Sequence, residues 1–131
     1  MVHNQVRNHL RRLRIFDRDS GTGALEPRNI IALGSAPEDV TLDADGTVWI
    51  AAHPKLLALR EHLRDPSEPS PTAVYRLRTS VIDKEDRVTI PFLDSGERFS
   101  AGSVAAVHDG RMLVGSLTER KILICELPEQ L

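Results

Sequence analysis

Two stretches of the chain decide the fold: EDVTLDADGTVWIAA at residues 38–52 and GSVAAVHDGRMLVGS at residues 102–116. Each reads as a strand, an acidic Asp-Gly turn and a second, strongly apolar strand. Asp-Gly is favoured in tight hairpins because glycine adopts a positive φ without steric cost. The two stretches therefore predict two copies of one hairpin unit in a chain built mostly of strands.

Short β-type runs bounded by turn residues recur along the rest of the chain, and about ten strands are expected in all. The segment 54–63 is ambiguous, because Leu56, Leu59 and Leu63 lie at helical spacing. A strand at 55–59 and a short helix both remain open there. The predicted fold class is all-β.

A repeated hairpin unit indicates a β-propeller, whose four-stranded blades surround a central axis. We expect a single partial propeller domain of roughly two and a quarter blades. Residues 1–35 would form the outer strands of one blade, 36–80 a full blade and 81–131 the last blade. A blade buries both faces only against its neighbours. This chain alone therefore cannot close the ring, and we expect it to be incomplete, with exposed blade faces and strand edges.

Composition excludes several classes of protein. The chain has 131 residues, a hydrophobic content of 40% and a formal net charge of −2, so it fits one domain and has no basic footprint for nucleic acid. No apolar stretch approaches the roughly 20 residues of a membrane span. The first residues also lack the apolar run of a secretory signal.

Residues 37–55, PEDVTLDADGTVWIAAHPK, and residues 121–127, KILICEL, resemble the paraoxonase/arylesterase family. The most specific pieces are the Trp-x-x-x-His-Pro string and the Cys-Glu-Leu ending. Wider relatives are the gluconolactonase (SMP-30-like) and strictosidine-synthase-like propellers. The resemblance covers essentially the whole chain. It implies the C-terminal segment of a six-bladed, calcium-dependent lactonase or arylesterase.

The resemblance also implies a site. In the family, calcium at the bottom of the central tunnel binds the substrate carbonyl, and a histidine pair near the tunnel mouth transfers protons. Most of these groups come from earlier blades, so no catalytic residue is assigned here and the isolated chain is expected to be inactive or weakly active. Glu38 and Asp39 match two metal positions, where the family usually has Asp and Asn. Two side chains supply few of the six to eight oxygens that Ca²⁺ takes, so binding should be weak.

Further positions follow from the same resemblance. His53 matches an active-site histidine, while Leu57, Ser103 and Leu117 fall at or next to wall positions that would shape a small lactone or ester substrate once the ring is complete. Cys125, the single cysteine, matches one that pairs with a cysteine near the amino terminus of secreted paraoxonases. That partner is absent, so a free thiol is expected.

Other interpretations of these residues stay open. Glu38 and Asp39 also fit a turn in which Asp39 caps backbone N–H groups, and His53 also fits a structural histidine. Asp43 and Asp45 favour turn chemistry over calcium binding, because the later positions of a calcium loop are missing. The alternative function is a non-catalytic module that self-associates or completes a propeller in trans with an N-terminal half.

Overall fold

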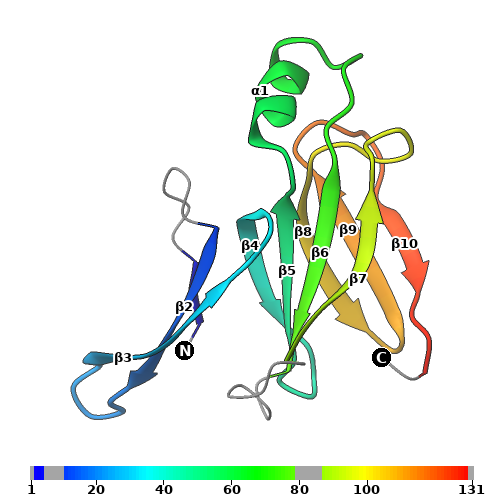
Figure 1. Cartoon of the computed structure of the whole chain (residues 1–131). Coiled ribbons are helices and arrows are strands. Elements are labelled where there is room, and N and C mark those ends of the chain that lie inside the picture. The colour runs from blue at the N-terminus through cyan, green and yellow to red at the C-terminus, as the bar shows by residue number, and fades with distance from the viewer. Residues whose placement is uncertain (1, 5–10, 79–86, 130–131) are drawn as a thin grey trace.

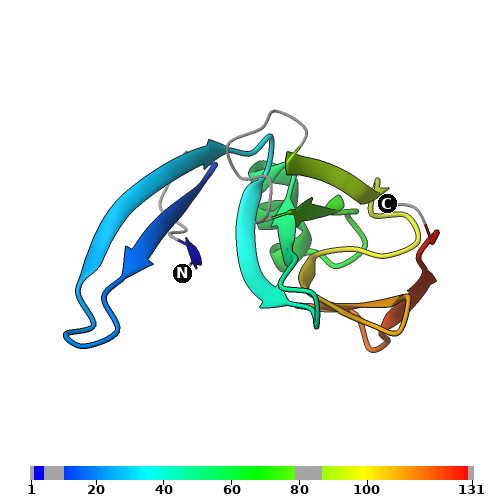
Figure 2. The ribbon, with the colours of Figure 1, turned by 90° about the horizontal axis from the view of Figure 1, so that it is seen from below.

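A computed structural model of the chain describes residues 2–4, 11–78 and 87–129, which form ten strands and one helix. The strands make three antiparallel sheets that follow one another along the chain (Figure 1). Seen from below, the three sheets also succeed one another in space (Figure 2). The predicted all-β class is confirmed.

The first sheet has the order β1-β2-β3, formed by Val2–Asn4, Arg12–Arg18 and Leu25–Ala32. The β2–β3 hairpin closes at Asp19, whose Oδ1 accepts the N–H groups of Gly21 and Thr22 at 2.9 and 2.7 Å. The sequence predicted only two outer strands in this part of the chain. The structure adds β1, which pairs antiparallel with β2.

The central sheet has four strands in the order β4-β5-β6-β7, formed by Ala36–Leu42, Val48–His53, Thr72–Leu77 and Val88–Asp94. Its last strand lies beyond residue 80, where the sequence placed the end of the full blade. Residues 79–86 lie outside the described residues. Because Val88 pairs with Leu77 across the β6–β7 ladder, the sheet continues to Asp94.

The third sheet, β8-β9-β10, is formed by Gly102–His108, Arg111–Ser116 and Leu123–Glu126, three strands as predicted for the last blade. Leu56–Arg64 forms helix α1, which settles the ambiguity at 54–63 in favour of a helix. Half-buried Ala58 and buried His62 lie on the side of α1 that faces the sheets. In the described part of the chain, no helix is long and apolar enough to cross a membrane.

The core lies between the sheets, because the middle strands β5 and β6 of the central sheet are buried on both faces. Alternate residues of β5 belong to different clusters, as the two-residue period of a strand requires. The cluster between the first and central sheets contains Leu13, Ile15, Ile31, Leu33, Val48, Ile50, Ala52, Ala73, Tyr75 and Leu77. The cluster between the central and third sheets contains Trp49, Val74, Phe99, Ala105, Met112 and Val114.

The outer faces of the first and third sheets are not covered by another sheet in the described part of the chain. Ile30, on the far face of the first sheet, is 53% exposed, and Ile124, on the far face of the third, is 63% exposed. Ile30 is followed by buried Ile31, and Ile124 lies between half-buried Leu123 and Cys125, so each side chain points away from the core. The three sheets therefore do not close a ring, as predicted. Cys125 is free and half-buried in β10, and burial raises the pKa of its thiol.

Asp94, at the end of β7, anchors the loop that leads to β8. Its buried Oδ2 accepts the N–H groups of Gly96 at 2.9 Å and Phe99 at 3.3 Å, and its Oδ1 accepts the Nε–H of Arg98 at 2.8 Å. Burial raises the pKa of this carboxyl, but the hydrogen bonds outweigh it, so the pKa lies below its usual value. The unfolded chain therefore binds this proton more tightly than the folded protein does.

Asp94 should make the fold sensitive to acid. Its contribution is complete above the unfolded pKa of about 3.9 and is lost as the pH falls through the folded value. We expect Asp94→Asn to lower the free energy of unfolding by about 2–3 kcal/mol at neutral pH. The variant should also lose less stability than the unaltered protein as the pH falls from 7 to 3, measured by urea unfolding. Asp17→Asn, at an exposed ion pair with Arg28, is the control and should change little. Equal losses in the two variants would contradict this role.

Candidate functional site

Helix α1 lies at one end of the sheets (Figure 1), and the residues predicted to form a site come from segments that begin or end there. His53 is the last residue of β5 and pairs with Ala36, the first residue of β4. Helix α1 begins three residues after His53, and its His62 Nε2 lies 2.6 Å from Thr118 Oγ1 in the connection that follows β9. One end of the molecule therefore carries the ends of β5 and β9 and the starts of β4 and β8.

Edge strands β4 and β8 lie side by side, as the strands nearest the axis of a propeller do. Thr41 Oγ1 of β4 donates a hydrogen bond of 2.5 Å to the Ala105 carbonyl of β8. This arrangement places the start of β4, with its two acidic residues, on the inner edge of the central sheet.

Glu38 occupies a β-bulge. Pro37 pairs with Ala52 and Asp39 pairs with Ala51, so Glu38 is an extra residue in β4. Bulges redirect side chains. The Glu38 carboxylate turns to His53, and its Oε2 lies 2.9 Å from His53 Nε2. The structure thus brings together a predicted metal position and a predicted substrate position.

The two partners differ in their access to solvent. His53 is 2% exposed, whereas the Glu38 side chain is 35% exposed. His53 Nδ1 is buried and has no hydrogen-bond partner within the described part of the chain. The pair therefore joins a fixed, buried ring to a carboxylate that reaches the surface.

Asp39 is exposed, and its Oδ1 accepts the N–H of Val40 at 2.8 Å. This is a capping bond of the kind that the sequence left open as an alternative to metal binding. Asp43 is occupied by its own hairpin: Oδ1 accepts the N–H of Thr47 at 3.0 Å, and Oδ2 accepts the Trp49 Nε1–H at 2.9 Å. Across residues 2–4, 11–78 and 87–129, no three His, Cys, Asp or Glu side chains form a metal-binding set. Glu38 and Asp39 are thus at most part of such a set.

The other predicted wall residues border the same end. Ser103 is the bulge residue of β8, between the pairs Gly102–Ser116 and Val104–Gly115, and is half-buried. Leu117 is exposed and donates its N–H to the Ala101 carbonyl at 3.0 Å.

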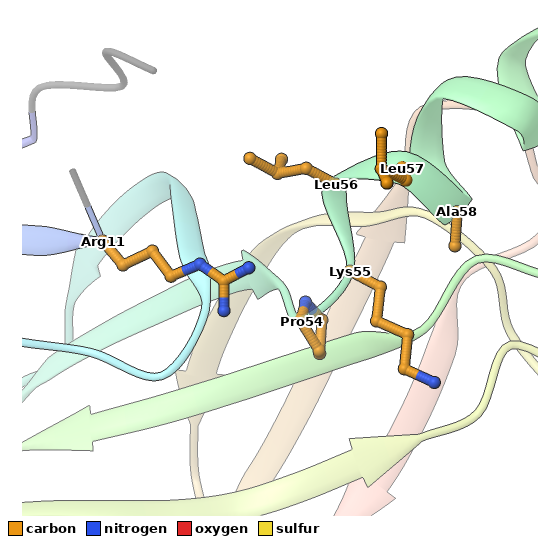
Figure 3. Close-up of a pocket in the computed structure, with 6 residues that line it drawn as sticks. All are labelled: Arg11, Pro54, Lys55, Leu56, Leu57 and Ala58. Atoms are coloured by element: carbon orange, nitrogen blue, oxygen red, sulfur yellow. The ribbon is translucent and has the colours of Figure 1, made fainter. Parts of the chain in front are cut away.

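Leu57 is 76% exposed and lines an open pocket of about 340 Å³ at the start of α1 (Figure 3). The other lining residues, none of them predicted from the sequence, are Arg11, Pro54, Lys55, Leu56 and Ala58. Arg11 extends toward Pro54, and its NH1 group donates a 2.6 Å bond to the Gly34 carbonyl. The lining is mostly apolar, with Arg11 and Lys55 as its charged residues.

Comparison with known proteins agrees with the family resemblance of the sequence. A family model described as Arylesterase matches residues 4–127. Serum paraoxonase/arylesterase 2 of Rattus norvegicus is 29% identical over 99 residues, which is 75% of this chain and 27% of that protein. Serum paraoxonase/lactonase 3 of Mus musculus is 32% identical over 104 residues, which is 79% of this chain and 28% of that protein. The chain thus spans slightly more than a quarter of the length of these relatives.

Proposed function

The chain belongs to the arylesterase family, and from this premise we propose that it supplies part of the active site of a calcium-dependent hydrolase of small lactones or esters. The observation that carries the proposal is the 2.9 Å contact between Glu38 and His53 on the inner edge of the central sheet. In the family resemblance these two positions border the metal and the substrate. A bound calcium ion would polarise the substrate carbonyl and stabilise the oxyanion that develops on it.

The carboxylates present are ligands of the type that calcium prefers, but they are too few to complete its coordination. Ca²⁺ takes six to eight oxygen ligands, and carboxylates are among those it prefers. Glu38 and Asp39 are adjacent acidic side chains with solvent access, so both could contribute oxygens. The remaining ligands would have to come from outside this pair. We therefore propose weak binding, with little or no turnover by the 131-residue chain.

Calcium titration of the chain, followed by the backbone amide signals in NMR spectra, tests this proposal. We expect saturable shifts at Glu38 and Asp39 with a Kd on the order of 1 mM or weaker, because the site has few charged ligands. Asp39→Ala should abolish these shifts. Asp45→Ala, which removes an exposed carboxylate from the neighbouring hairpin, should leave them in place. Shifts that survive in Asp39→Ala would place the ion elsewhere and contradict the proposal.

Hydrolysis is measured on the same samples, with an aryl acetate and a five-membered lactone, in calcium and in chelator. The expected result is a rate close to that of buffer. Calcium-dependent hydrolysis that disappears in Asp39→Ala would instead mean that this chain alone completes a working site.

A second function is favoured by the open sheet faces. Ile124 and Leu113 are exposed together on the far face of the third sheet, and Ile30 is exposed on the first. Such faces suit a non-catalytic module that self-associates or completes a propeller in trans. Sedimentation velocity at several concentrations separates the two functions, because a monomer at every concentration contradicts self-association.

A further inference from the structure

The Glu38–His53 contact fixes which nitrogen of the ring carries the proton. An ionised carboxylate only accepts hydrogen bonds, so Nε2, which lies 2.9 Å from Glu38 Oε2, carries the hydrogen. Nδ1 is buried, and no described residue bonds to it. The geometry therefore places a proton on Nε2, the ring nitrogen that faces Glu38.

The other buried histidine provides an internal comparison. His62 Nδ1 lies 2.5 Å from the Glu68 carbonyl and its Nε2 lies 2.6 Å from Thr118 Oγ1, so both ring nitrogens are bonded. Because a carbonyl only accepts, His62 carries its proton on Nδ1. His62 fastens α1 to the connection after β9. His53 instead directs its Nε2–H to the Glu38 carboxylate, which is partly open to solvent.

We propose that His53 is a positioning residue that holds Glu38 ready for a divalent cation. The Nε2–H donor, 2.9 Å from Glu38 Oε2, orients the carboxylate from the side of the buried ring. Hydrogen bonds to a ligating carboxylate from outside the metal's own ligands commonly set its orientation. The bulge at Glu38 and the burial of His53 fix both ends of this bond before any ion arrives. The role of His53 toward a cation depends on the proposed function, whereas the position of its ring proton does not.

The first test needs neither metal nor activity. Long-range ¹H–¹⁵N spectra of the imidazoles in the metal-free chain at neutral pH should show His53 protonated on Nε2 and His62 protonated on Nδ1. Glu38→Ala should release His53 into a tautomer mixture and leave His62 unchanged. A His53 ring protonated on Nδ1, or a His53 signal that Glu38→Ala does not alter, would overturn the inference and leave the proposed function standing.

The second test asks whether the bond serves cation binding. We expect His53→Leu to weaken calcium binding about 10–100-fold, because loss of the hydrogen-bond partner of a metal ligand commonly has an effect of this size. His53→Gln, which keeps an N–H donor, should stay closer to the unaltered chain. In the unaltered chain, calcium should also shift the His53 Nε2–H proton, because a cation on Glu38 withdraws electron density from Oε2. This measurement requires no substitution, so it holds even if His53→Leu fails to fold.

The outcomes of this test separate the two proposals. Equal calcium affinity in the unaltered chain and His53→Leu, or binding that leaves the Nε2–H proton unmoved, overturns the positioning role alone. Absence of calcium binding at Glu38 and Asp39 in every variant overturns the proposed function and, with it, the role toward a cation.

Discussion

Phe99→Ala should lower the free energy of unfolding by about 3–5 kcal/mol. Phe99 is fully buried in the loop between β7 and β8, where it joins Trp49 and Val74 of the central sheet to Met112 of the third. Truncation would leave a cavity between the two sheets, where the surrounding strands cannot collapse. Urea unfolding followed by the fluorescence of Trp49, the only tryptophan, measures the loss directly beside the altered site.

Two variants make this prediction specific. Phe99→Leu keeps most of the apolar volume and should cost less than about 1.5 kcal/mol. Phe92→Ala removes the same ring from a half-buried position at the border of the same cluster, so it should cost clearly less than Phe99→Ala. If Phe92→Ala and Phe99→Ala cost the same, Phe99 is not the side chain that joins the central sheet to the third.

Gly102→Ala should destabilise the protein by about 3 kcal/mol through overpacking. A Cβ on Gly102 would lie 2.2 Å from Thr72 Cγ2 and 3.0 Å from Thr72 Oγ1. Thr72 is fully buried, and its Oγ1 accepts the Gly102 N–H at 2.8 Å, so neither strand can retreat without breaking this bond. Thermal or urea unfolding provides the measurement.

A double-mutant cycle with Thr72→Ser identifies the cause. Serine keeps the Oγ1 that accepts the Gly102 N–H but removes the methyl group that a new Cβ would meet. We expect Gly102→Ala to cost about 1–2 kcal/mol less in this background, a coupling typical of residues in contact. Gly21→Ala, whose Cβ would lie 3.4 Å from Asp19 Oδ1, should be nearly neutral. Strict additivity of the two changes would show that the methyl contact is not responsible.

The parts of the fold that depend on local chemistry were predictable from the sequence. The two Asp-Gly turns form as expected, with φ of 76° at Gly46 and 71° at Gly110. The end of the central sheet was not predictable, because the polar residues before Val88 resemble a boundary between blades. Only the pairing of Val88 with Leu77, a contact set by tertiary structure, shows that β7 belongs to the central sheet.

The candidate site, like the fold, was predictable from the sequence only in part. The family resemblance picked out Glu38 and His53 separately, but their contact depends on a bulge set by the pairing of β4 with β5. Arg11 lies immediately before β2 and lines the pocket, but no local motif marks it as a pocket residue. Asp94 also carries no motif, since its role arises from the burial of a loop that folds back onto its carboxylate.

Every residue of β5 is buried, and the strand is paired on both sides. Its backbone amides can therefore exchange with deuterium only when the whole domain unfolds, whereas those of β10, paired on one side, exchange through local fraying. His53 ends the strand that should open least often. Its ring should therefore stay in place beside Glu38 for as long as the domain remains folded.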